Sequence, residues 1–335
     1  MSKPVTIALD AMGGDHGVSV AVPAALKMLR KRPDLRITLV GRPEDIAGVL
    51  DGETHERLQI CEASEVVDMD EPPADALRKK KDSSMRVAIN LVKEGKADAC
   101  VSAGNTGALM ATGRFVLKTL PGIDRPAIMA IMPTKTGRSY MLDLGANSEC
   151  TAEQLFQFAV MGSVVMQGLE DLDHAPRVGL LNIGEEEIKG NDTIREAARL
   201  LGESSLNYVG FIEGNSIADQ KADVVVCDGF SGNIALKSME GTAKMVAHFL
   251  EREFRGSPYG WFAGLVALPL LRSLRKRMDP RRYNGASFVG LNGIVVKSHG
   301  GADALAMVQA IKVAALEVEK QVPAQIRRLL EQQAG

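Results

Sequence analysis

A buried strand, a glycine-containing turn and a long helix are expected to follow one another from Ala222 onward. The strand is the unbroken apolar run Val224–Cys227, a pattern typical of a strand covered on both faces of a parallel sheet. The turn, Asp228–Asn233, contains two glycines, a serine and an asparagine, and an amphipathic helix is expected from about Ile234 to about Phe254. Backbone N–H groups at such a helix start can bind an anion or a carbonyl oxygen that becomes negatively charged.

The same succession of elements recurs along the chain and indicates the fold class. The segment Ala97–Gly107 has an apolar run, then glycine and asparagine, then a helix start. Turns of similar composition follow the expected strands Tyr140–Leu144 and Val178–Ile183. This alternation predicts an α/β fold in a single domain over residues 1–335. We expect the turns after Ala97 and Ala222 to meet at the carboxyl edge of one sheet, where such folds bind ligands.

Composition and charge exclude several classes of protein. The 335 residues carry a formal net charge of −2 and are 45% hydrophobic, which is typical of a soluble globular protein and argues against a general nucleic-acid binder. The four cysteines have no paired spacing, which indicates a reducing cytoplasm and no structural zinc. The sequence starts directly with strand residues, so we expect no signal peptide.

Lysine, asparagine and glycine side by side before a helix start make the strongest candidate for an anion site. Lys189 precedes Gly190 and Asn191, and a helix is expected from about Thr193. A lysine beside free backbone N–H groups can bind an oxyanion or a phosphate, although a solvated loop is the alternative. His299 lies in another glycine-rich turn, where a structural role is more common than general-base catalysis. The candidates for phosphate and substrate binding are Gly104, Asn105, Thr106, Asn147, Gly190, Asn191, Ser231, Gly232 and His299.

Several familiar chemistries have no support in the sequence. There is no Gly-x-Gly-x-x-Gly fingerprint and no Walker A loop, so we expect no nucleotide cofactor. No His and carboxylate pair has metal-ligand spacing, and we expect no metal. Gly229–Gly232 resembles a nucleophile elbow, but its second glycine comes one residue early, which leaves an acyl-enzyme on Ser231 as a minor alternative. The remaining site suits a nucleophile that is already ionised at neutral pH, such as inorganic phosphate.

A second unusual segment combines apolar and basic residues. Tyr259–Leu271 is apolar, holds the only tryptophan and is too short to span a bilayer, which needs about 20 residues. Arginines and lysines follow it closely, which suits shallow insertion into an anionic membrane surface, with a core helix or a dimer interface as alternatives. We expect residues 234–282 to form a protruding helical hairpin. The predicted membrane contacts are Trp261, Phe262, Leu265 and Leu268.

These segments together resemble the PlsX family, the acyl-carrier-protein:phosphate acyltransferases of bacterial phospholipid synthesis. The match runs essentially end to end. The segments that carry it are Ala8–Asp15, Arg78–Met85, Ser102–Gly107, Asp143–Asn147, Asn182–Glu186 with Lys189–Asn191, and Asp228–Asn233. The resemblance implies a Rossmann-like α/β/α sandwich similar to phosphotransacetylases and isopropylmalate dehydrogenases, and a homodimer.

The resemblance also implies an activity. A member of the family converts a fatty acyl-carrier thioester and phosphate into acyl phosphate, without a cofactor, at the inner face of the cell membrane. The lysine and asparagine that match Lys189 and Asn233 are implied to be catalytic. The partners would be acyl carrier protein and an anionic membrane surface, and contact with the downstream glycerol-phosphate acyltransferase is also conceivable. The candidates for docking the acidic carrier are Arg78, Lys79, Lys80, Arg272, Arg275, Lys276 and Arg277.

A mechanism follows as a hypothesis. Phosphate would be held by Lys189, by the backbone of Gly190 and Asn191, and by the turn Ser102–Gly107. The oxyanion of the attacked thioester would be bound by the Asn233 side chain and by backbone N–H groups of Ser231–Asn233. Two alternatives remain, a thioesterase that uses Ser231 and a membrane-bound scaffold that binds carrier protein without turnover.

Overall fold

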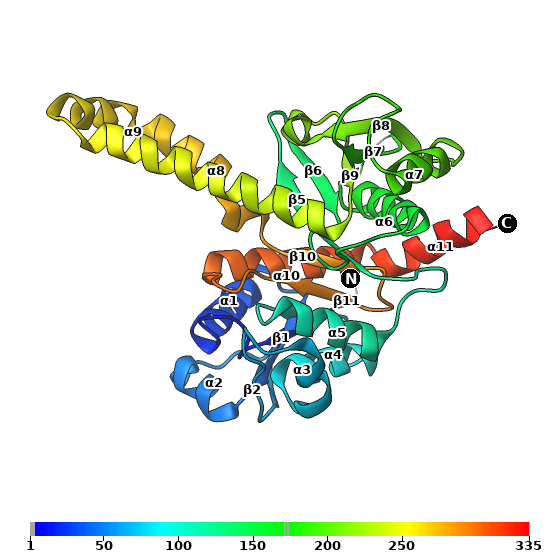
Figure 1. The fold of residues 1–335 in the computed structure, drawn as a ribbon. Helices are drawn as coiled ribbons and strands as arrows, with labels where there is room; N and C mark the ends of the chain where they lie inside the picture. The colour runs from blue at the N-terminus through cyan, green and yellow to red at the C-terminus, as the bar shows by residue number, and fades with distance from the viewer. Residues whose placement is uncertain (1–3, 171, 173, 335) are drawn as a thin grey trace.

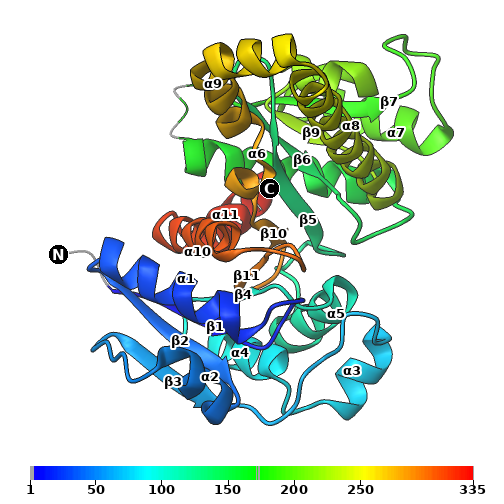
Figure 2. The same cartoon turned by 90° about the vertical axis from the view of Figure 1, so that its left-hand side faces the viewer.

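The structure, a computed structural model, describes residues 4–170, 172 and 174–334 (Figure 1). In two helices the side chains of Arg275, Arg277, Met278 and residues 332–334 lie outside the description. The described strands form an eleven-stranded sheet in the order β3-β2-β1-β4-β11-β10-β5-β6-β9-β7-β8. Helices cover both faces of this sheet (Figures 1 and 2). The predicted α/β class is confirmed.

The first third of the chain builds one side of the sheet. In β1, Ile7 and Leu9 face the core that contains α1, whereas Ala8 faces the core that contains α4 and α5. Strands β1 to β4 run parallel, as the buried apolar runs predict. The elements are β1 (Val5–Asp10), α1 (Val18–Lys31), β2 (Leu35–Gly41), α2 (Pro43–Leu50), β3 (Leu58–Glu62), α3 (Pro73–Lys79), α4 (Ser84–Lys93), β4 (Ala99–Ser102) and α5 (Thr106–Leu117).

The middle part of the chain builds the other side of the sheet. The strands Ala127–Pro133 and Arg138–Leu142 pair antiparallel, and the strands that follow lie parallel to the second of them. Figure 2 shows these strands in the upper lobe and β1 to β3 in the lower one. The elements are β5 (Ala127–Pro133), β6 (Arg138–Leu142), α6 (Ala152–Glu170), β7 (Arg177–Asn182), α7 (Asp192–Gly202), β8 (Asn207–Glu213), the 3-10 helix η1 (Gly214–Asp219) and β9 (Val224–Val226).

Two long helices form the hairpin. They are α8 (Gly229–Arg255) and α9 (Pro258–Met278), and they extend together away from the sheet (Figure 1). Helix α8 begins five residues before the predicted start, because Asp228 caps it by accepting a hydrogen bond from the backbone N–H of Ser231. The segment that was expected to be an open turn is therefore the first part of a helix.

The C-terminal part joins the two lobes. Strands β10 (Ala286–Val289) and β11 (Ile294–Lys297) are antiparallel and follow the 3-10 helix η2 (Pro280–Tyr283). Helices α10 (Ala304–Glu319) and α11 (Val322–Ala334) complete the chain. Helix α11 packs onto the protein, because its residues Val322 and Ile326 are buried in the same core as α6.

The strand direction changes within the sheet, and this corrects one prediction. β4 is parallel to β11, but β10 is antiparallel to both β11 and β5, and β5 is antiparallel to β6. β9 follows the direction of β6, so the carboxyl ends of β4 and β9 lie at opposite edges. The expected meeting of the two turns at one carboxyl edge is wrong.

The twist of the sheet reduces the angle between the directions of β4 and β9. Neighbouring strands rotate by about 20 to 25°, and five steps separate β4 from β9 in the sheet order. The accumulated rotation of roughly 100 to 125° leaves the two strand directions roughly 55 to 80° apart instead of opposed. Lys237 on α8 lies close enough to Lys297 and His299, at and just after the end of β11, to act on their pKa values, and we call this region between the two lobes the cleft.

Candidate active site

The start of α8 is packed directly against the turn that follows β6. A Cβ atom on Gly232 would lie 1.9 Å from the carbonyl oxygen of Asp143, and one on Gly229 would lie 2.7 Å from that of Asn147. Only glycine allows this approach, which places the side chain of Asn233 next to Gly145. The glycines of the segment after β9 therefore position α8 instead of forming an open anion-binding loop.

Buried Asp143 organises the turn after β6. Its carboxylate accepts hydrogen bonds from the backbone N–H groups of Ile128, Ala146 and Asn147, at 2.9, 3.0 and 2.7 Å. The Asn147 amide donates to Asp143 Oδ2 and to the carbonyl oxygen of Pro126, both at 2.9 Å. Burial raises the pKa of Asp143 and the hydrogen bonds oppose that shift. Asn147 is thus a structural residue of this turn.

Two predicted oxyanion donors are already occupied. The backbone N–H of Ser231 donates to Asp228 Oδ1 at 2.7 Å, and that of Gly232 donates to the Asp228 carbonyl oxygen at 2.9 Å. The Ser231 hydroxyl donates to Asp228 Oδ2 at 3.0 Å. The prediction that these backbone groups stabilise an oxyanion is wrong, because the helix cap already uses them.

The predicted asparagines differ in what their amides do. Asn105 caps α5 by accepting from Ala108 N at 3.0 Å and donates to the carbonyl oxygens of Met69 and Glu71, both at 2.9 Å. Asn191 caps α7 by accepting from Ile194 N at 2.9 Å. Asn233 is exposed, and its side chain makes no hydrogen bond to any residue that the structure describes. Among the described residues, the Nδ2 groups of Asn233 and of Asn191 make no hydrogen bond within the protein and are available to a ligand, and Asn233 also keeps its Oδ1 free.

Lys189 lies in the loop between β7 and α7. Its carbonyl oxygen accepts a hydrogen bond from Asn182 Nδ2 at 3.2 Å, and its exposed ammonium has no ion-pair partner within the described part of the chain. Gly190 has a φ of 90°, and a Cβ there would lie 2.5 Å from Asn182 Oδ1, so the turn requires glycine. Because β7 and β9 are parallel neighbours, Lys189 and Asn233 both follow strand ends at one edge of the sheet.

The loops after β1, β4 and β11 form the other wall of the cleft. Buried Asp10 accepts a hydrogen bond from Ser102 Oγ at 2.6 Å, and burial raises its pKa. Gly104 N donates to Ser102 Oγ at 3.0 Å, and a Cβ on Gly13 would lie 2.8 Å from Gly104 N. Gly104, Asn105 and Thr106 therefore belong to this wall, and no hydrogen bond joins them to Lys189 or Asn233 in the described residues.

Two lysines in the cleft were missed in the sequence analysis. Lys297 is buried at the end of β11 and donates to the carbonyl oxygens of Ala103, at 3.1 Å, and Ser298. Burial lowers the pKa of Lys297 to about 8, against the opposing effect of Asp10. Lys237 follows Asn233 by one helical turn, a spacing that puts both on one side of α8. This four-residue separation from Asn233 is the sequence feature from which Lys237 could have been predicted.

His299 marks where α8 meets the β11 loop. Its backbone N–H donates to Asn284 Oδ1 at 3.0 Å, and its Nδ1 accepts from Gly301 N at 3.1 Å. Burial lowers the pKa of His299, Glu240 opposes this, and Lys237 adds to it. Lys237 and Glu240, on the same side of α8 as Asn233, therefore lie close enough to the His299 imidazole to act on its pKa.

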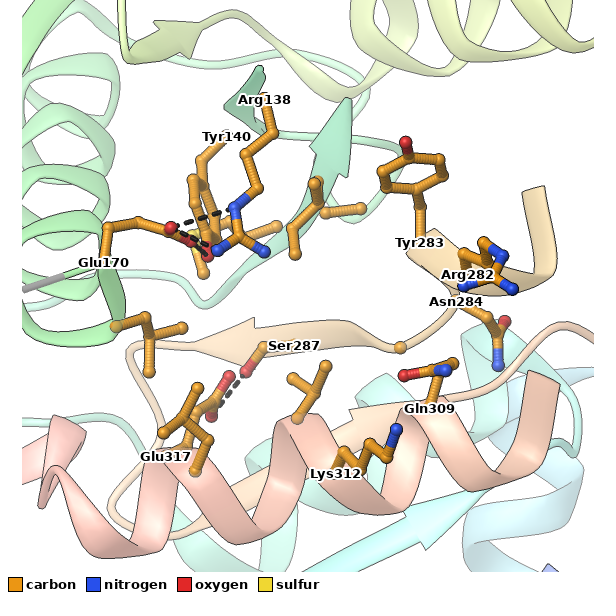
Figure 3. A pocket seen from close by; sticks show the side chains of 17 residues that line it. Arg138, Tyr140, Glu170, Arg282, Tyr283, Asn284, Ser287, Gln309, Lys312 and Glu317 are labelled. Carbon is orange, nitrogen blue, oxygen red and sulfur yellow. Dashed lines mark hydrogen bonds and ion pairs between the residues drawn. The ribbon is translucent and has the colours of Figure 1, made fainter. Parts of the chain in front are cut away.

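A separate cavity of about 180 Å³ lies between α10 and the strands β5, β6 and β10 (Figure 3), and one of its lining residues, Asn284, accepts the hydrogen bond from the His299 backbone N–H. Tyr140 donates to Glu170 Oε1 at 2.6 Å, and Arg138 pairs with the same carboxylate. Ser287 Oγ donates to Glu317 Oε2 at 2.9 Å, while Glu317 Oε1 is buried without a partner. Burial raises the pKa of Glu317 to about 8. None of the predicted site residues lines this cavity.

Of the predicted surface residues, one is paired within the protein and others are exposed to solvent. Lys80 is half-buried, pairs with Glu71 at 2.7 Å and donates to the carbonyl oxygen of Val66, so its charge is consumed within the protein. Arg78 and Lys79 are exposed, as are Arg272 and Lys276, while the side chains of Arg275 and Arg277 lie outside the described residues. The exposed fractions of the predicted membrane contacts are 65% for Trp261, 61% for Phe262, 54% for Leu265 and 36% for Leu268. No described helix is long and apolar enough to cross a bilayer.

The fold is that of the phosphotransacetylases. The structure is similar to a phosphotransacetylase from Streptococcus pyogenes, with a TM-score of 0.63 and 21% sequence identity over 94% of each chain. It is also similar to a branched-chain phosphotransacylase from Enterococcus faecalis V583, with a TM-score of 0.56 and 14% identity over 94% of this chain and 99% of that one. Identities this low establish the fold alone.

Sequence comparison establishes the family. The family model described as "Fatty acid synthesis protein" matches residues 5–325. A curated phosphate acyltransferase from Alkalilimnicola ehrlichii is 62% identical over 99% of this chain and 97% of its own length, and one from Nitrosococcus oceani is 58% identical over 98% and 97%. The chain therefore belongs to this fatty acid synthesis protein family, which confirms the resemblance to the PlsX family.

Proposed function

We propose that the protein transfers a fatty acyl group from an acyl-carrier-protein thioester to inorganic phosphate and so produces acyl phosphate. The observation that carries the proposal is the free amide of Asn233, which lies at the same sheet edge as Lys189. The names of the curated relatives, phosphate acyltransferases, support it. An amide donor and an ammonium group at one rim suit a carbonyl and an anion that react with each other.

The reaction needs no strong base. A phosphate oxygen attacks the thioester carbonyl carbon, and a C–O bond forms while the carbonyl oxygen becomes an oxyanion. Asn233 Nδ2 donates a hydrogen bond to that oxyanion, and Lys189 holds the phosphate. The oxyanion then returns to a carbonyl group and the C–S bond breaks. The thiolate leaves readily, because the pKa of its thiol is only about 8.5. It takes a proton from water.

The structure reduces the set of groups available for these steps. Ser231, Gly232 and the side chains of Asn105 and Asn147 are used within the protein, and Asn191 uses its Oδ1 to cap α7. The charge for binding phosphate therefore comes from Lys189, and Lys237 adds a second positive charge one turn beyond Asn233. The Nδ1 of His299 already accepts a hydrogen bond from the backbone N–H of Gly301, so we assign His299 no proton transfer and keep it as a wall of the cleft.

A thioesterase is the weaker alternative. The Ser231 hydroxyl donates to a carboxylate that also caps α8, and no histidine is hydrogen-bonded to it among the described residues. A serine nucleophile needs an adjacent base that can accept its proton. Ser231 therefore acts as part of the helix cap.

The surfaces beyond the cleft fit a peripheral membrane enzyme. In this proposal the exposed apolar residues at the hairpin tip insert into the inner face of the cell membrane, and Arg272 and Lys276 are candidates for docking the acidic carrier. Arg78 and Lys79 dock the acidic carrier, and two chains form a homodimer. These assignments go with the proposed function and are separate from the transfer step itself.

The deciding experiment measures transfer directly. The purified protein is incubated with hexadecanoyl-carrier protein, with and without phosphate, and both acyl phosphate and free fatty acid are quantified. We expect acyl phosphate to form in proportion to phosphate at low concentration. Fatty acid release without phosphate would favour the thioesterase, and no turnover of any kind would favour the scaffold.

A further inference from the structure

Glu317 presents an unsatisfied polar atom to the cavity between α10 and the strands β5, β6 and β10. The residue is 2% exposed, its Oε2 accepts a hydrogen bond from Ser287 Oγ at 2.9 Å, and its Oε1 has no partner. Within the part of the chain that the structure describes, no other buried side-chain oxygen or nitrogen lacks a partner. An unsatisfied buried carboxyl oxygen costs free energy. Its place on a cavity wall therefore indicates that a ligand or a water molecule bonds it.

One face of α10 lines the cavity. The lining residues of this helix follow the helical spacing i, i+3, i+4, i+7 and i+8, and they are Gln309, Lys312, Val313, Leu316 and Glu317. In Figure 3 the side chains of Gln309, Lys312 and Glu317 point from α10 toward the strands. From Lys312 to Glu317 the helix rises by about 7.5 Å. A ligand that contacts both side chains can therefore be small.

The cavity has room for a small organic body with hydroxyl groups. Its volume is about 180 Å³, whereas a cavity of about 150 Å³ is sufficient for a benzene molecule. The hydroxyl groups of Ser287 and Tyr140 belong to its lining residues, and so do the apolar side chains of Met129, Leu169 and Leu316. Binding pockets commonly combine apolar surface with a few polar groups that orient the ligand. The wall thus suits a body of a few carbon atoms that carries hydroxyl groups.

The mouth of the cavity is positively charged. Lys312 and Arg282 line it and are exposed, and neither has an ion-pair partner among the described residues. Burial lowers the pKa of this lysine, and the nearby charges of Lys31, Arg282 and Lys27 lower it further. Four cations gathered in this way favour an anion of high charge. A phosphate monoester carries a charge of about −1.5 to −2 at neutral pH.

The two carboxyl groups of the cavity do not oppose such an anion. Glu170 is paired with Arg138 and accepts a hydrogen bond from the Tyr140 hydroxyl at 2.6 Å. Burial raises the pKa of Glu317 to about 8, so this group is mostly protonated at neutral pH. A protonated carboxyl group can donate as well as accept a hydrogen bond, and so can a hydroxyl group of a ligand.

We propose that this cavity binds the phosphate monoester of a small polyol, with a hydroxyl group on Glu317 Oε1 and the phosphate at Lys312 and Arg282. Both arginine and lysine bind phosphate through charge-assisted hydrogen bonds. None of the residues predicted for acyl transfer lines the cavity, so this inference does not rest on the proposed function. Asn284 connects the two regions, because it lines the cavity and its Oδ1 accepts from the backbone N–H of His299.

The probe is glycerol phosphate, a three-carbon polyol with one phosphate, which is titrated into the full chain by calorimetry. We expect a saturable binding site that is present in both the wild type and Lys189→Ala. Propyl phosphate, which keeps the charge but has no hydroxyl group, should bind at least tenfold more weakly, because it cannot bond Glu317 Oε1. Glycerol should also bind at least tenfold more weakly, because it lacks the negative charge for Lys312 and Arg282.

Lys312→Gln is the deciding variant, since it removes one charge at the mouth from an exposed position and should leave the fold intact. We expect it to weaken the binding of glycerol phosphate at least tenfold. Leu316→Trp should do the same by occupying part of the cavity, and its unfolding curve checks that it folds. Lys93→Gln is the matched control and should bind as the wild type does. Lys93 is exposed on α4, has no ion-pair partner among the described residues and does not line the cavity.

Each contrary result overturns the proposal. Loss of binding in Lys189→Ala, with binding retained in Lys312→Gln, would place glycerol phosphate in the cleft instead. Equal affinities for glycerol phosphate and propyl phosphate would show that no hydroxyl group is recognised at Glu317. Absence of binding at millimolar glycerol phosphate would leave Glu317 Oε1 to a water molecule alone. None of these measurements uses acyl transfer, so failure of this site is a different result from failure of the proposed function.

Discussion

Asn233→Ala separates the catalytic role of the amide from any structural role. Asn233 lies in the first turns of α8, is exposed, and its side chain makes no hydrogen bond to the described residues. Alanine has a higher helix propensity than asparagine by roughly 0.5 kcal/mol. The free energy of unfolding should therefore stay equal or rise slightly.

The loss of rate should be large. Removing one oxyanion donor typically lowers kcat by about 10² to 10³, which corresponds to about 2.7 to 4 kcal/mol of transition-state stabilisation. The backbone N–H groups of Ser231 and Gly232 do not replace it, because both are bonded to Asp228. We expect kcat for acyl phosphate formation to fall within this range while KM for phosphate changes little.

Asn147→Ala is the contrasting variant. Its buried amide bonds Asp143 and the carbonyl oxygen of Pro126, so its loss leaves two buried acceptors short of a donor. Each costs about 1 to 3 kcal/mol, and denaturant unfolding should show a lower stability. If Asn233→Ala instead kept kcat within a few-fold of wild type, or lost as much stability as Asn147→Ala, the assignment of the oxyanion donor would be refuted.

Three further variants test other parts of the proposal. Lys189→Ala should raise KM for phosphate and lower kcat, with partial recovery in Lys189→Arg; an unchanged phosphate dependence would contradict its role. Replacing Trp261 and Leu265 with aspartate should abolish sedimentation with anionic vesicles while turnover in solution continues, and persistent vesicle binding would remove the tip from the proposal. For Glu317, burial raises the pKa to about 8, so the folded state holds a proton that the unfolded state releases. Wild-type stability should therefore fall between about pH 4.5 and 8, by up to about 4 to 5 kcal/mol relative to Glu317→Gln. Parallel stability curves for the two proteins would contradict this pKa.

The sequence was sufficient for the local elements and for the family. Apolar runs such as Val224–Cys227 depend on a few neighbouring residues, and the strands and helices occur near where they were expected. The protruding hairpin could also be predicted, because an apolar segment with attached cations fits poorly into a core. The specific glycine and asparagine segments together indicated the family, and the comparisons confirmed it.

Partners distant in sequence decided the composition of the site. Asn105 bonds the carbonyl oxygens of Met69 and Glu71, and Lys80 pairs with Glu71, so neither side chain is available, although nothing adjacent to them in sequence indicates this. The reversal of direction between β4 and β9 likewise results from β10 and β5, which lie far apart in the chain. Local sequence determines which backbone conformation a segment prefers. Only the tertiary structure determines which polar groups are left free for a substrate, since each hydrogen-bonding group is used by whichever partner the fold brings to it.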